Sequence, residues 1–261
     1  MIKGLFVTGT DTDVGKTVIA AGLAGVFKQM GLKVGVMKPI QTGAVKKSGK
    51  LVSLDIELMI KTSEIVEDIN LLNPYCLEPP VAPLVASQIT GIRIDIKKII
   101  SAYTTLITKY DTVIVEGAGG LLVPILNNYL MIDLIKDLNL PILIVARPSL
   151  GTINHTLLSI REAQSQGIHV LGVVINGLRE DSAGICERTN PQIIEEISKV
   201  PTLGVIPYST KISLDGCNPG DIIDLLKERM NITPFLVDTL MIPTGKRLGR
   251  TSNTNSLTSH W

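Results

Sequence analysis

One nine-residue segment near the start of the chain constrains the fold more than any other feature. The run Gly9-Thr10-Asp11-Thr12-Asp13-Val14-Gly15-Lys16-Thr17 fits the spacing G-x-x-x-x-G-K-[ST]. In this pattern the backbone N–H groups of a glycine-rich turn surround phosphate oxygens, and the N-terminus of the next helix adds a partial positive charge. An apolar run at 2–8 precedes the segment and a helical pattern at 15–30 follows it. The sequence therefore predicts a phosphate-binding loop, in which Lys16 reaches the phosphates and Thr17 offers its hydroxyl to Mg²⁺.

The rest of the chain alternates short apolar runs with longer amphipathic segments. We expect strands at 2–8, 33–38, 111–116, 141–146, 170–176 and 202–206, and helices at 15–30, 95–108, 152–166, 191–199 and 221–230. Uninterrupted apolar strands separated by helices indicate a parallel sheet that is covered on both faces. The expected fold class is α/β, P-loop NTPase-like, with a mostly parallel central sheet and helices on both faces. Ligands bind such sheets beyond the carboxyl ends of the strands.

Composition excludes several classes of protein. The chain has 25 Lys and Arg against 24 Asp and Glu, a net charge of +1, so nucleic acid is not an expected partner. The cysteines Cys76, Cys186 and Cys217 form no C-x-x-C pair, which argues against a zinc site or a disulfide framework. The longest apolar runs, at 140–146 and 170–175, are too short to cross a membrane, and the N-terminus lacks a signal-peptide pattern. We therefore expect a cytoplasmic protein with no membrane partner.

The composition also changes towards the C-terminus. Residues 244–259 are rich in Thr, Ser, Asn and Gly, and the last acidic residue is Asp238. We expect a single P-loop domain over 1–231 and a C-terminal extension over 232–261, whose last part, about 244–261, is disordered. The alternative is an ordered arm that contacts a partner.

Three further residues lie where a phosphate-binding loop needs support. Lys38 ends the second expected strand, where it either points at the ligand or is merely solvated. Glu116 ends the third strand and precedes Gly117-Ala118-Gly119-Gly120, a position typical of a Walker B carboxylate. Asp55 lies at an expected helix start, where it either binds a metal or only caps the helix. Because Mg²⁺ prefers hard oxygen ligands, Thr17, Asp55 and Glu116 are the expected metal ligands.

Several other short blocks follow in a fixed order. They are K-P-I-Q-T-G at 38–43, N-P-Y at 73–75, E-P-P-V-A-P at 78–83, V-E-G-A-G-G at 115–120, L-G-T-I-N-H-T at 150–156 and I-P-Y at 206–208. Together with the loop and Asp55, this series resembles the dethiobiotin synthetases, ATP-dependent ligases of biotin synthesis. The similarity runs from Phe6 to about Tyr208. The chain departs from some members at 147–150, where Arg-Pro-Ser-Leu lacks a lysine before Leu-Gly, and the tail after Asn231 lies outside the resemblance.

The resemblance implies a reaction. The substrates would be 7,8-diaminononanoate, CO₂ and ATP, with Mg²⁺ as cofactor. One amine and CO₂ give a carbamate, the carbamate attacks the γ-phosphate, and the second amine closes the resulting carbamic-phosphoric anhydride to a cyclic urea. The products would be dethiobiotin, ADP and phosphate. The family also implies a homodimer with sites near the subunit interface, to which the partner subunit contributes.

The resemblance and the motif together give the expected site. Lys16 and Lys38 are the expected catalytic residues, because two reacting anions need positive charge between them. The expected nucleotide-binding residues are Asp13, Val14, Gly15, Lys16, Thr17, Val18, Asp55, Glu116, Gly117, Gly119, Asn176 and Pro207. The expected substrate-binding residues are Thr12, Lys38, Thr42, Gly151 and Asn154. Thr12 and Thr42 are alternatively turn threonines, Asn154 a polar residue at a helix start, and Asp13 a solvated turn acid.

Three other readings stay open on the sequence alone. A cobyrinate-type amide synthase would need a glutaminase domain with a nucleophilic Cys and a His, for which this chain is too short. A partition-type P-loop ATPase switch would carry a lysine directly after the first loop glycine, where this chain has Thr10. A nucleotide-binding module without catalysis would not need both Lys38 and Glu116.

Overall fold

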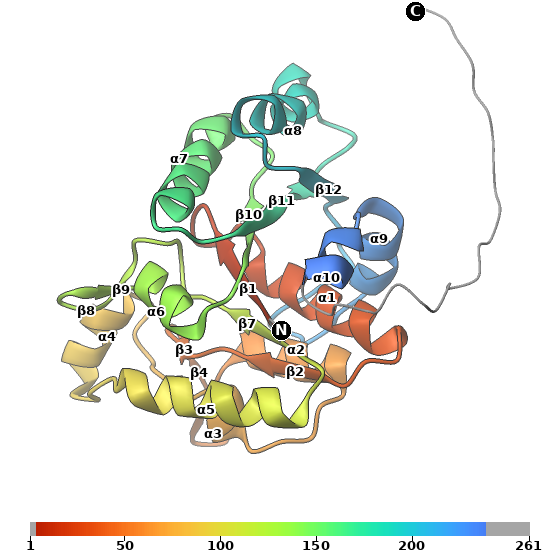
Figure 1. Ribbon diagram of the computed structural model, residues 1–261. Helices are drawn as coiled ribbons and strands as arrows, with labels where there is room; N and C mark the ends of the chain where they lie inside the picture. Colours follow the sequence, from red (N-terminus) through yellow and green to blue (C-terminus); the bar gives the residue numbers. More distant parts are fainter. Residues whose placement is uncertain (1–3, 239–261) are drawn as a thin grey trace, which may run out of the picture.

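A parallel β-sheet forms the centre of the protein. The computed structural model describes residues 4–238, and these form a six-stranded sheet in the order β12-β11-β10-β1-β7-β2, in which every neighbouring pair is parallel. The strands are β1 (Gly4–Gly9), β2 (Val34–Met37), β7 (Thr112–Glu116), β10 (Ile142–Ala146), β11 (Val170–Leu178) and β12 (Thr202–Pro207). Each corresponds to one of the six strands expected from the sequence, so the expected α/β class with a parallel sheet is confirmed (Figure 1).

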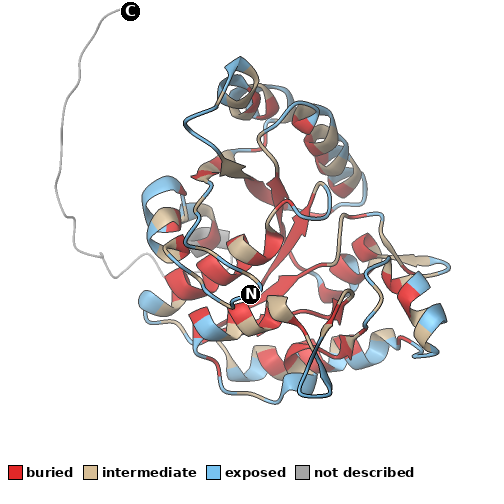
Figure 2. Ribbon diagram, turned by 180° about the vertical axis from the view of Figure 1, so that it is seen from behind, coloured by how far each residue is buried: buried red, intermediate tan, exposed pale blue. Residues whose placement is uncertain are grey.

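Helices cover both faces of this sheet. The helix that follows the loop, α1 (Lys16–Gln29), packs with α2 (Leu54–Ser63) and α9 (Ile222–Arg229) on one face. The opposite face carries α5 (Ile96–Lys109) with α6 (Met131–Leu138), and α7 (Thr152–Ser165) with α8 (Ile185–Ser198) (Figure 1). The strands β1, β7 and β10 are buried along their whole length, because both of their faces are covered (Figure 2).

Small elements surround the carboxyl ends of β2 and β7. They are β3 (Ile40–Gln41) paired with β6 (Tyr75–Cys76), the hairpin of β4 (Val45–Lys47) and β5 (Lys50–Val52), and the pair β8 (Pro124–Leu126) and β9 (Tyr129–Leu130). The short helices α3 (Ile69–Leu72) and α4 (Pro83–Thr90) complete this region. None of these short elements was expected from the sequence. The helix start expected around Asp55 corresponds to α2.

The expected helix at 191–199 was wrong at its start. Proline is common at the first position of a helix, and the expected helix begins at Pro191. In the structure α8 begins at Ile185, six residues earlier, with Pro191 inside it. The Glu187 side chain accepts a hydrogen bond from the Gly184 N–H at 2.9 Å and so caps the true N-terminus.

The chain beyond Asn231 continues to pack on the domain as far as the structure describes it. The helix α10 (Thr233–Asp238) carries Phe235, which is fully buried and meets Phe27 of α1 edge to face, with ring centroids 6.1 Å apart. The expected disorder of 244–261 lies outside the described residues. No helix within residues 4–238 has the length and apolar character needed to cross a membrane.

Candidate active site

The phosphate-binding loop connects β1 to α1 as the motif predicts. Gly15 is the N-cap of α1 and has a φ of 88°, a conformation that glycine adopts without strain. A Cβ atom at Gly15 would lie 2.0 Å from the Asn176 side-chain nitrogen, so the position also requires glycine for space. Asn176, near the end of β11, donates a hydrogen bond to the Val14 carbonyl at 3.0 Å. The loop is therefore fixed from the neighbouring strand.

Lys16 folds back across this loop. Its Nζ donates to the Asp11 carbonyl at 2.7 Å, and the residue is only 6% exposed. Burial lowers the pKa of the Lys16 ammonium, and the nearby Lys38 lowers it further. Arg147, at the departure noted in the sequence, pairs with the Asp11 carboxylate at 3.3 Å on the outer side of the loop. An anion inside the loop would relieve the unfavourable burial of the Lys16 charge.

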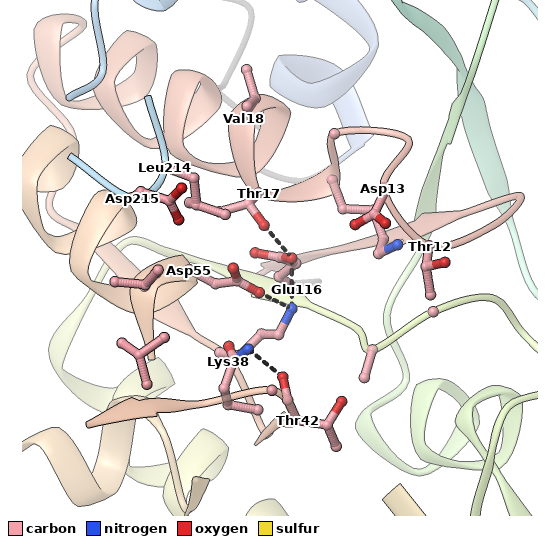
Figure 3. Close-up of a pocket in the computed structure, with 18 residues that line it drawn as sticks. Thr12, Asp13, Thr17, Val18, Lys38, Thr42, Asp55, Glu116, Leu214 and Asp215 are labelled. Atoms are coloured by element: carbon pink, nitrogen blue, oxygen red, sulfur yellow. Dashed lines mark hydrogen bonds and ion pairs between the residues drawn. The ribbon is translucent and has the colours of Figure 1, made fainter. Parts of the chain in front are cut away.

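A buried ion cluster lies next to the loop (Figure 3). Lys38 Nζ lies 2.6 Å from Asp55 Oδ2 and 2.6 Å from Glu116 Oε1, and it also donates to the Gly117 carbonyl at 3.2 Å. The Thr17 hydroxyl donates to the same Glu116 oxygen at 2.8 Å. The side chains of Lys38, Asp55 and Glu116 are 4%, 13% and 1% exposed, so a merely solvated Lys38 is excluded. Capping of α2 falls to Ser53, which leaves Asp55 free to face the cluster.

The cluster carries more negative than positive charge. Burial lowers the pKa of Lys38, but the attraction of Glu116 and Asp55 outweighs it, and the pKa is raised above its ordinary 10.5. Burial and the neighbouring Asp55 raise the pKa of Glu116, although Lys38 opposes the shift. The second oxygen of Glu116, Oε2, is buried and has no hydrogen-bond partner. An unsatisfied buried acceptor is costly, so this oxygen is suited to a further cation or donor.

The loop and the cluster open into one cavity of about 530 Å³. Among the described residues it is lined by Thr12, Asp13, Gly15, Lys16, Thr17, Val18, Lys38, Gln41, Thr42, Gly43, Val45, Leu54, Asp55, Glu116, Ala118, Gly119, Leu214 and Asp215. Eleven of these residues belong to the expected site: Thr12, Asp13, Gly15, Lys16, Thr17, Val18, Lys38, Thr42, Asp55, Glu116 and Gly119. The structure thus brings together residues from five separate parts of the sequence.

The other expected residues do not line this cavity. Val14 is part of the loop, and its side chain is buried. Gly117 follows Glu116, and a Cβ atom at this position would meet the Phe6 ring at 2.7 Å. Pro207 ends β12. Gly151 and Asn154 are exposed at the start of α7.

Sequence reasoning missed seven lining residues. They are Gln41, Gly43, Val45, Leu54, Ala118, Leu214 and Asp215. Gln41, Gly43 and Ala118 stand inside motif blocks that were recognised, so their position was a usable signal. Leu214 and Asp215 belong to a turn closed by hydrogen bonds between Ser213 and Asn218, for which the sequence offers no motif.

The oxygen atoms of the cluster suit a magnesium ion. The Thr17 hydroxyl donates to Glu116, the Glu116 and Asp55 carboxylates meet at Lys38, and Glu116 keeps an unpartnered oxygen. Hard oxygens of this kind are what Mg²⁺ prefers, and it keeps several waters as further ligands. Within residues 4–238 no three His, Cys, Asp or Glu side chains gather as a metal site.

Comparison with known proteins gives a consistent result. A family model described as an AAA domain matches residues 3–214. The ATP-dependent dethiobiotin synthetase BioD of Thermodesulfovibrio yellowstonii is 44% identical over 222 residues, which cover 82% of this chain and 92% of that protein. BioD of Bacillus subtilis (strain 168) is 39% identical over 232 residues, which cover 89% of this chain and 96% of that protein.

Solved structures show the same fold at much lower sequence identity. The septum site-determining protein MinD of Pyrococcus horikoshii, complexed with Mg-ADP, has a TM-score of 0.56 and 17% identity, over 93% of this chain and 98% of that one. MinC:MinD of Aquifex aeolicus gives a TM-score of 0.55 at 19% identity, over 96% and 98% of the two chains. This likeness confirms the P-loop NTPase architecture and shows the fold alone, so it does not favour the partition-type reading. The relatives, the loop and the buried cluster lead to one conclusion: the chain belongs to the family of ATP-dependent dethiobiotin synthetases.

Proposed function

We propose that this protein converts 7,8-diaminononanoate, CO₂ and ATP into dethiobiotin, ADP and phosphate, the synthesis for which its relatives are named. The observation that carries the proposal is the position of Lys38. Its ammonium is buried in the same cavity as the phosphate-binding loop, beside Asp55 and Glu116. A second buried cation next to a phosphate site suits a reaction in which one anion attacks another.

The proposed chemistry has three steps. An amine nitrogen bonds to the carbon of CO₂ and loses a proton, which gives a carbamate. A carbamate oxygen then bonds to the γ-phosphorus, and the bond from that phosphorus to the bridging oxygen breaks, so ADP leaves. The second amine bonds to the carbonyl carbon and loses a proton, phosphate leaves with the carbamate oxygen, and a cyclic urea results.

Positive charge is what the protein supplies to the second step. A carbamate and a triphosphate repel each other, and phosphoryl transfer depends mainly on position and charge. Lys16 reaches across the loop that would hold the phosphates, and Lys38 approaches from the end of β2. The three protons of Lys38 are directed at Asp55, Glu116 and the Gly117 carbonyl, so it must give up at least one of these contacts to reach the reacting oxygens.

The metal ligands we propose are Thr17, Asp55 and Glu116. When bound, Mg²⁺ would neutralise charge on the phosphate oxygens of ATP. Two of these ligands, the Asp55 and Glu116 carboxylates, now hold the Lys38 ammonium, and the Thr17 hydroxyl donates to the same Glu116 oxygen. This arrangement supports both a cation at this point and the release of Lys38 when one binds.

The diamine and the adenine of ATP would meet different parts of the chain. Thr12 and Thr42 line the cavity and are proposed to contact the diamine or its carbamate. Asn176 and Pro207, at the carboxyl ends of β11 and β12, are proposed to lie at the adenine end of ATP, with Asn176 also holding the loop.

A second copy of the chain would complete the site. Gly151 and Asn154 are exposed at the start of α7 and lie outside the cavity lining, so we propose that they meet substrate in the partner's cavity. We therefore propose a homodimer. A cytoplasmic location is likewise proposed, and it is supported by three free cysteines.

A phosphate-release assay tests the function. Purified protein is given Mg²⁺ and ATP, with and without 7,8-diaminononanoate and bicarbonate, and dethiobiotin is measured by mass spectrometry. Phosphate release is expected only when both additions are present, and the Lys16→Ala variant is expected to release none while keeping its fold. Tight ATP binding without any response to the diamine would exclude this function and leave the phosphate-binding loop intact.

A further inference from the structure

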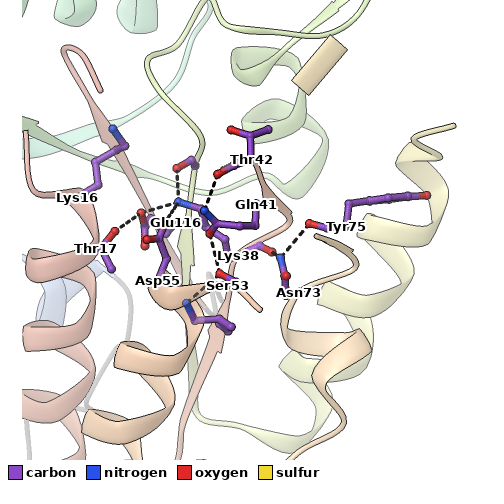
Figure 4. Close-up of polar contacts among 12 residues, drawn as sticks. Lys16, Thr17, Lys38, Gln41, Thr42, Ser53, Asp55, Asn73, Tyr75 and Glu116 are labelled. Atoms are coloured by element: carbon purple, nitrogen blue, oxygen red, sulfur yellow. Dashed lines mark hydrogen bonds and ion pairs between the residues drawn. The ribbon is translucent and has the colours of Figure 1, made fainter. Parts of the chain in front are cut away.

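Gln41 lies between Thr42 and Ser53, the residue that caps α2 (Figure 4). It lines the cavity at the end of β3, is 8% exposed, and has no role in the loop motif or in the expected ligand sets. Its side-chain Oε1 accepts a hydrogen bond from the Ser53 hydroxyl at 2.6 Å. Its Nε2 donates to the Thr42 carbonyl at 2.7 Å. The oxygen and the nitrogen of this buried amide are therefore both hydrogen-bonded, the oxygen to Ser53 and the nitrogen to Thr42.

The Ser53 side leads to the metal-binding carboxylate. Ser53 is 2% exposed and is the N-cap of α2, where its hydroxyl accepts a hydrogen bond from the Ile56 N–H at 3.2 Å. The hydroxyl has one proton to donate, and this proton goes to Gln41. Asp55 stands two residues after Ser53, in the first turn of α2, and its carboxylate meets Lys38. The direction of this turn, and with it the position of Asp55, depends on where Ser53 is held.

The backbone of Gln41 is itself fixed. Its carbonyl accepts a hydrogen bond from the Leu77 N–H at 2.8 Å, and β3 is paired with β6 in register Gln41 to Cys76. The Gln41 backbone is thus held in place by β6, and its side chain forms one hydrogen bond with the start of α2 and another with Thr42. Thr42 is a proposed substrate contact. The Gln41 side chain therefore contacts both the residue that caps α2 and the backbone of a residue on the substrate side.

We propose that Gln41 is a positioning residue, which holds Asp55 in place through Ser53 and fixes the Thr42 backbone on the substrate side. The inference rests on the proposed function, because it takes Asp55 as a metal ligand and Thr42 as a substrate contact. Its consequence is that loss of the Gln41 amide weakens metal-dependent nucleotide binding, while the phosphate-binding loop, which Gln41 does not contact, is unaffected.

Nucleotide binding without turnover is the direct readout. Gln41→Met keeps an unbranched side chain of similar length and removes both hydrogen bonds. The dissociation constant of ADP is measured by titration calorimetry with Mg²⁺ and again with EDTA. We expect the value with Mg²⁺ to rise about tenfold, the effect of losing roughly one buried hydrogen bond, and the value with EDTA to stay unchanged.

A double variant tests whether Gln41 acts through Ser53. Ser53→Ala should raise the Mg²⁺-dependent dissociation constant by a similar factor, and Gln41→Met with Ser53→Ala should be no worse than Ser53→Ala alone, because both changes break one chain of contacts. Thr62→Val is the matched control. It removes another buried hydroxyl of α2, bonded only within that helix, and should leave the metal dependence at the wild-type value.

Each contrary result has a distinct meaning. A Gln41→Met protein that melts at a lower temperature but binds ADP with Mg²⁺ like the wild type would show a purely structural residue and overturn the inference. Additive effects in the double variant would overturn the route through Ser53. A raised KM for the diamine with unchanged metal dependence would make Gln41 a substrate contact instead. If the wild type makes no dethiobiotin, the proposed function fails, while the calorimetric comparison of Gln41 still stands.

Discussion

At the scale of single residues, the position of Lys38 decides how the site is interpreted. Its ammonium is held by the same carboxylates that we propose for the metal, Asp55 and Glu116. Removing one partner of a buried ion pair leaves the other charge uncompensated, which typically costs about 3–5 kcal/mol. Lys38 therefore stabilises the metal-free protein in addition to its proposed part in the reaction.

This double role predicts how a Lys38→Met variant responds to magnesium. The variant should unfold at a lower temperature than the wild type in EDTA, because Asp55 and Glu116 lose their cation. Mg²⁺ without nucleotide should raise its melting temperature more than that of the wild type, since the ion then meets no competing ammonium. Differential scanning fluorimetry with and without Mg²⁺ measures both effects. Equal shifts in the two proteins would show that metal and ammonium do not share the site.

Alkaline pH provides a second test of the cluster. The pKa of Lys38 is raised above 10.5 in the folded protein by Glu116 and Asp55, which outweigh burial. The stabilisation from its charge is therefore complete below the unfolded pKa of 10.5 and is lost as pH rises from there through the folded pKa. The difference in free energy of unfolding between wild type and Lys38→Met should stay constant to about pH 10 and shrink above it. Urea unfolding across this range measures the difference, and a decline already at neutral pH would contradict the account.

The site residues that end strands could be predicted from the sequence, whereas contacts that depend on packing could not. Lys38 and Glu116 could be identified because parallel strands present their carboxyl ends to one crevice. Gln41 lies inside a recognised motif block, but its contact with Ser53 depends on how β3 and α2 meet in space. Asn176 was expected to bind the nucleotide, and the structure shows in addition that it holds the Val14 carbonyl, a contact across 162 positions that no local pattern encodes.

At the scale of elements, long buried strands were predictable and short ones were not. The six strands of the central sheet are continuous apolar runs, whereas β3 and β6 have two residues each and offer no period to detect. The helix α6 begins directly after Leu130, without a polar N-cap side chain to announce it. The hairpin of β4 and β5 turns at Ser48 and Gly49, which both have positive φ, but half of its strand residues are lysines and most are exposed.

The short helix α10 is expected to contribute more stability than its length suggests. Phe235 is fully buried against Phe27, and truncating a buried Phe to Ala typically costs about 3–5 kcal/mol. Phe235→Ala should therefore lower the urea midpoint of the whole domain and leave the KM for ATP unchanged. Phe235→Leu keeps most of the volume and should lose less. If Phe235→Ala unfolds at the wild-type urea concentration, α10 does not belong to the cooperative domain.

At the scale of the whole molecule, the sheet order explains why distant motifs meet. The strand β1 lies between β10 and β7, with β2 next to β7, so the loop after β1, Lys38 after β2 and Glu116 at the end of β7 share one edge. The expected fold was right in this respect because the apolar pattern of the strands and the loop motif agree. The tail beyond the described residues is still an expectation from composition.

The proposed dimer is a prediction at this scale. Light scattering of the purified protein should give a mass close to twice the 28.1 kDa of the chain. Asn154→Ala, at the exposed start of α7, should raise the KM for the diamine without changing that mass, because the residue is proposed to contact substrate in the partner's cavity. A monomer with full activity would contradict the shared site.

An oxygen of the carbamate is proposed to attack the γ-phosphate in this cavity, and isotope transfer provides a direct test. The protein is mixed with Mg²⁺, ATP, 7,8-diaminononanoate and ¹⁸O-labelled bicarbonate, and the reaction is stopped before the label exchanges with water. We expect one ¹⁸O in the released phosphate, formed in a one-to-one ratio with dethiobiotin. Phosphate that carries only oxygen from ATP and water, even though dethiobiotin forms, would contradict it.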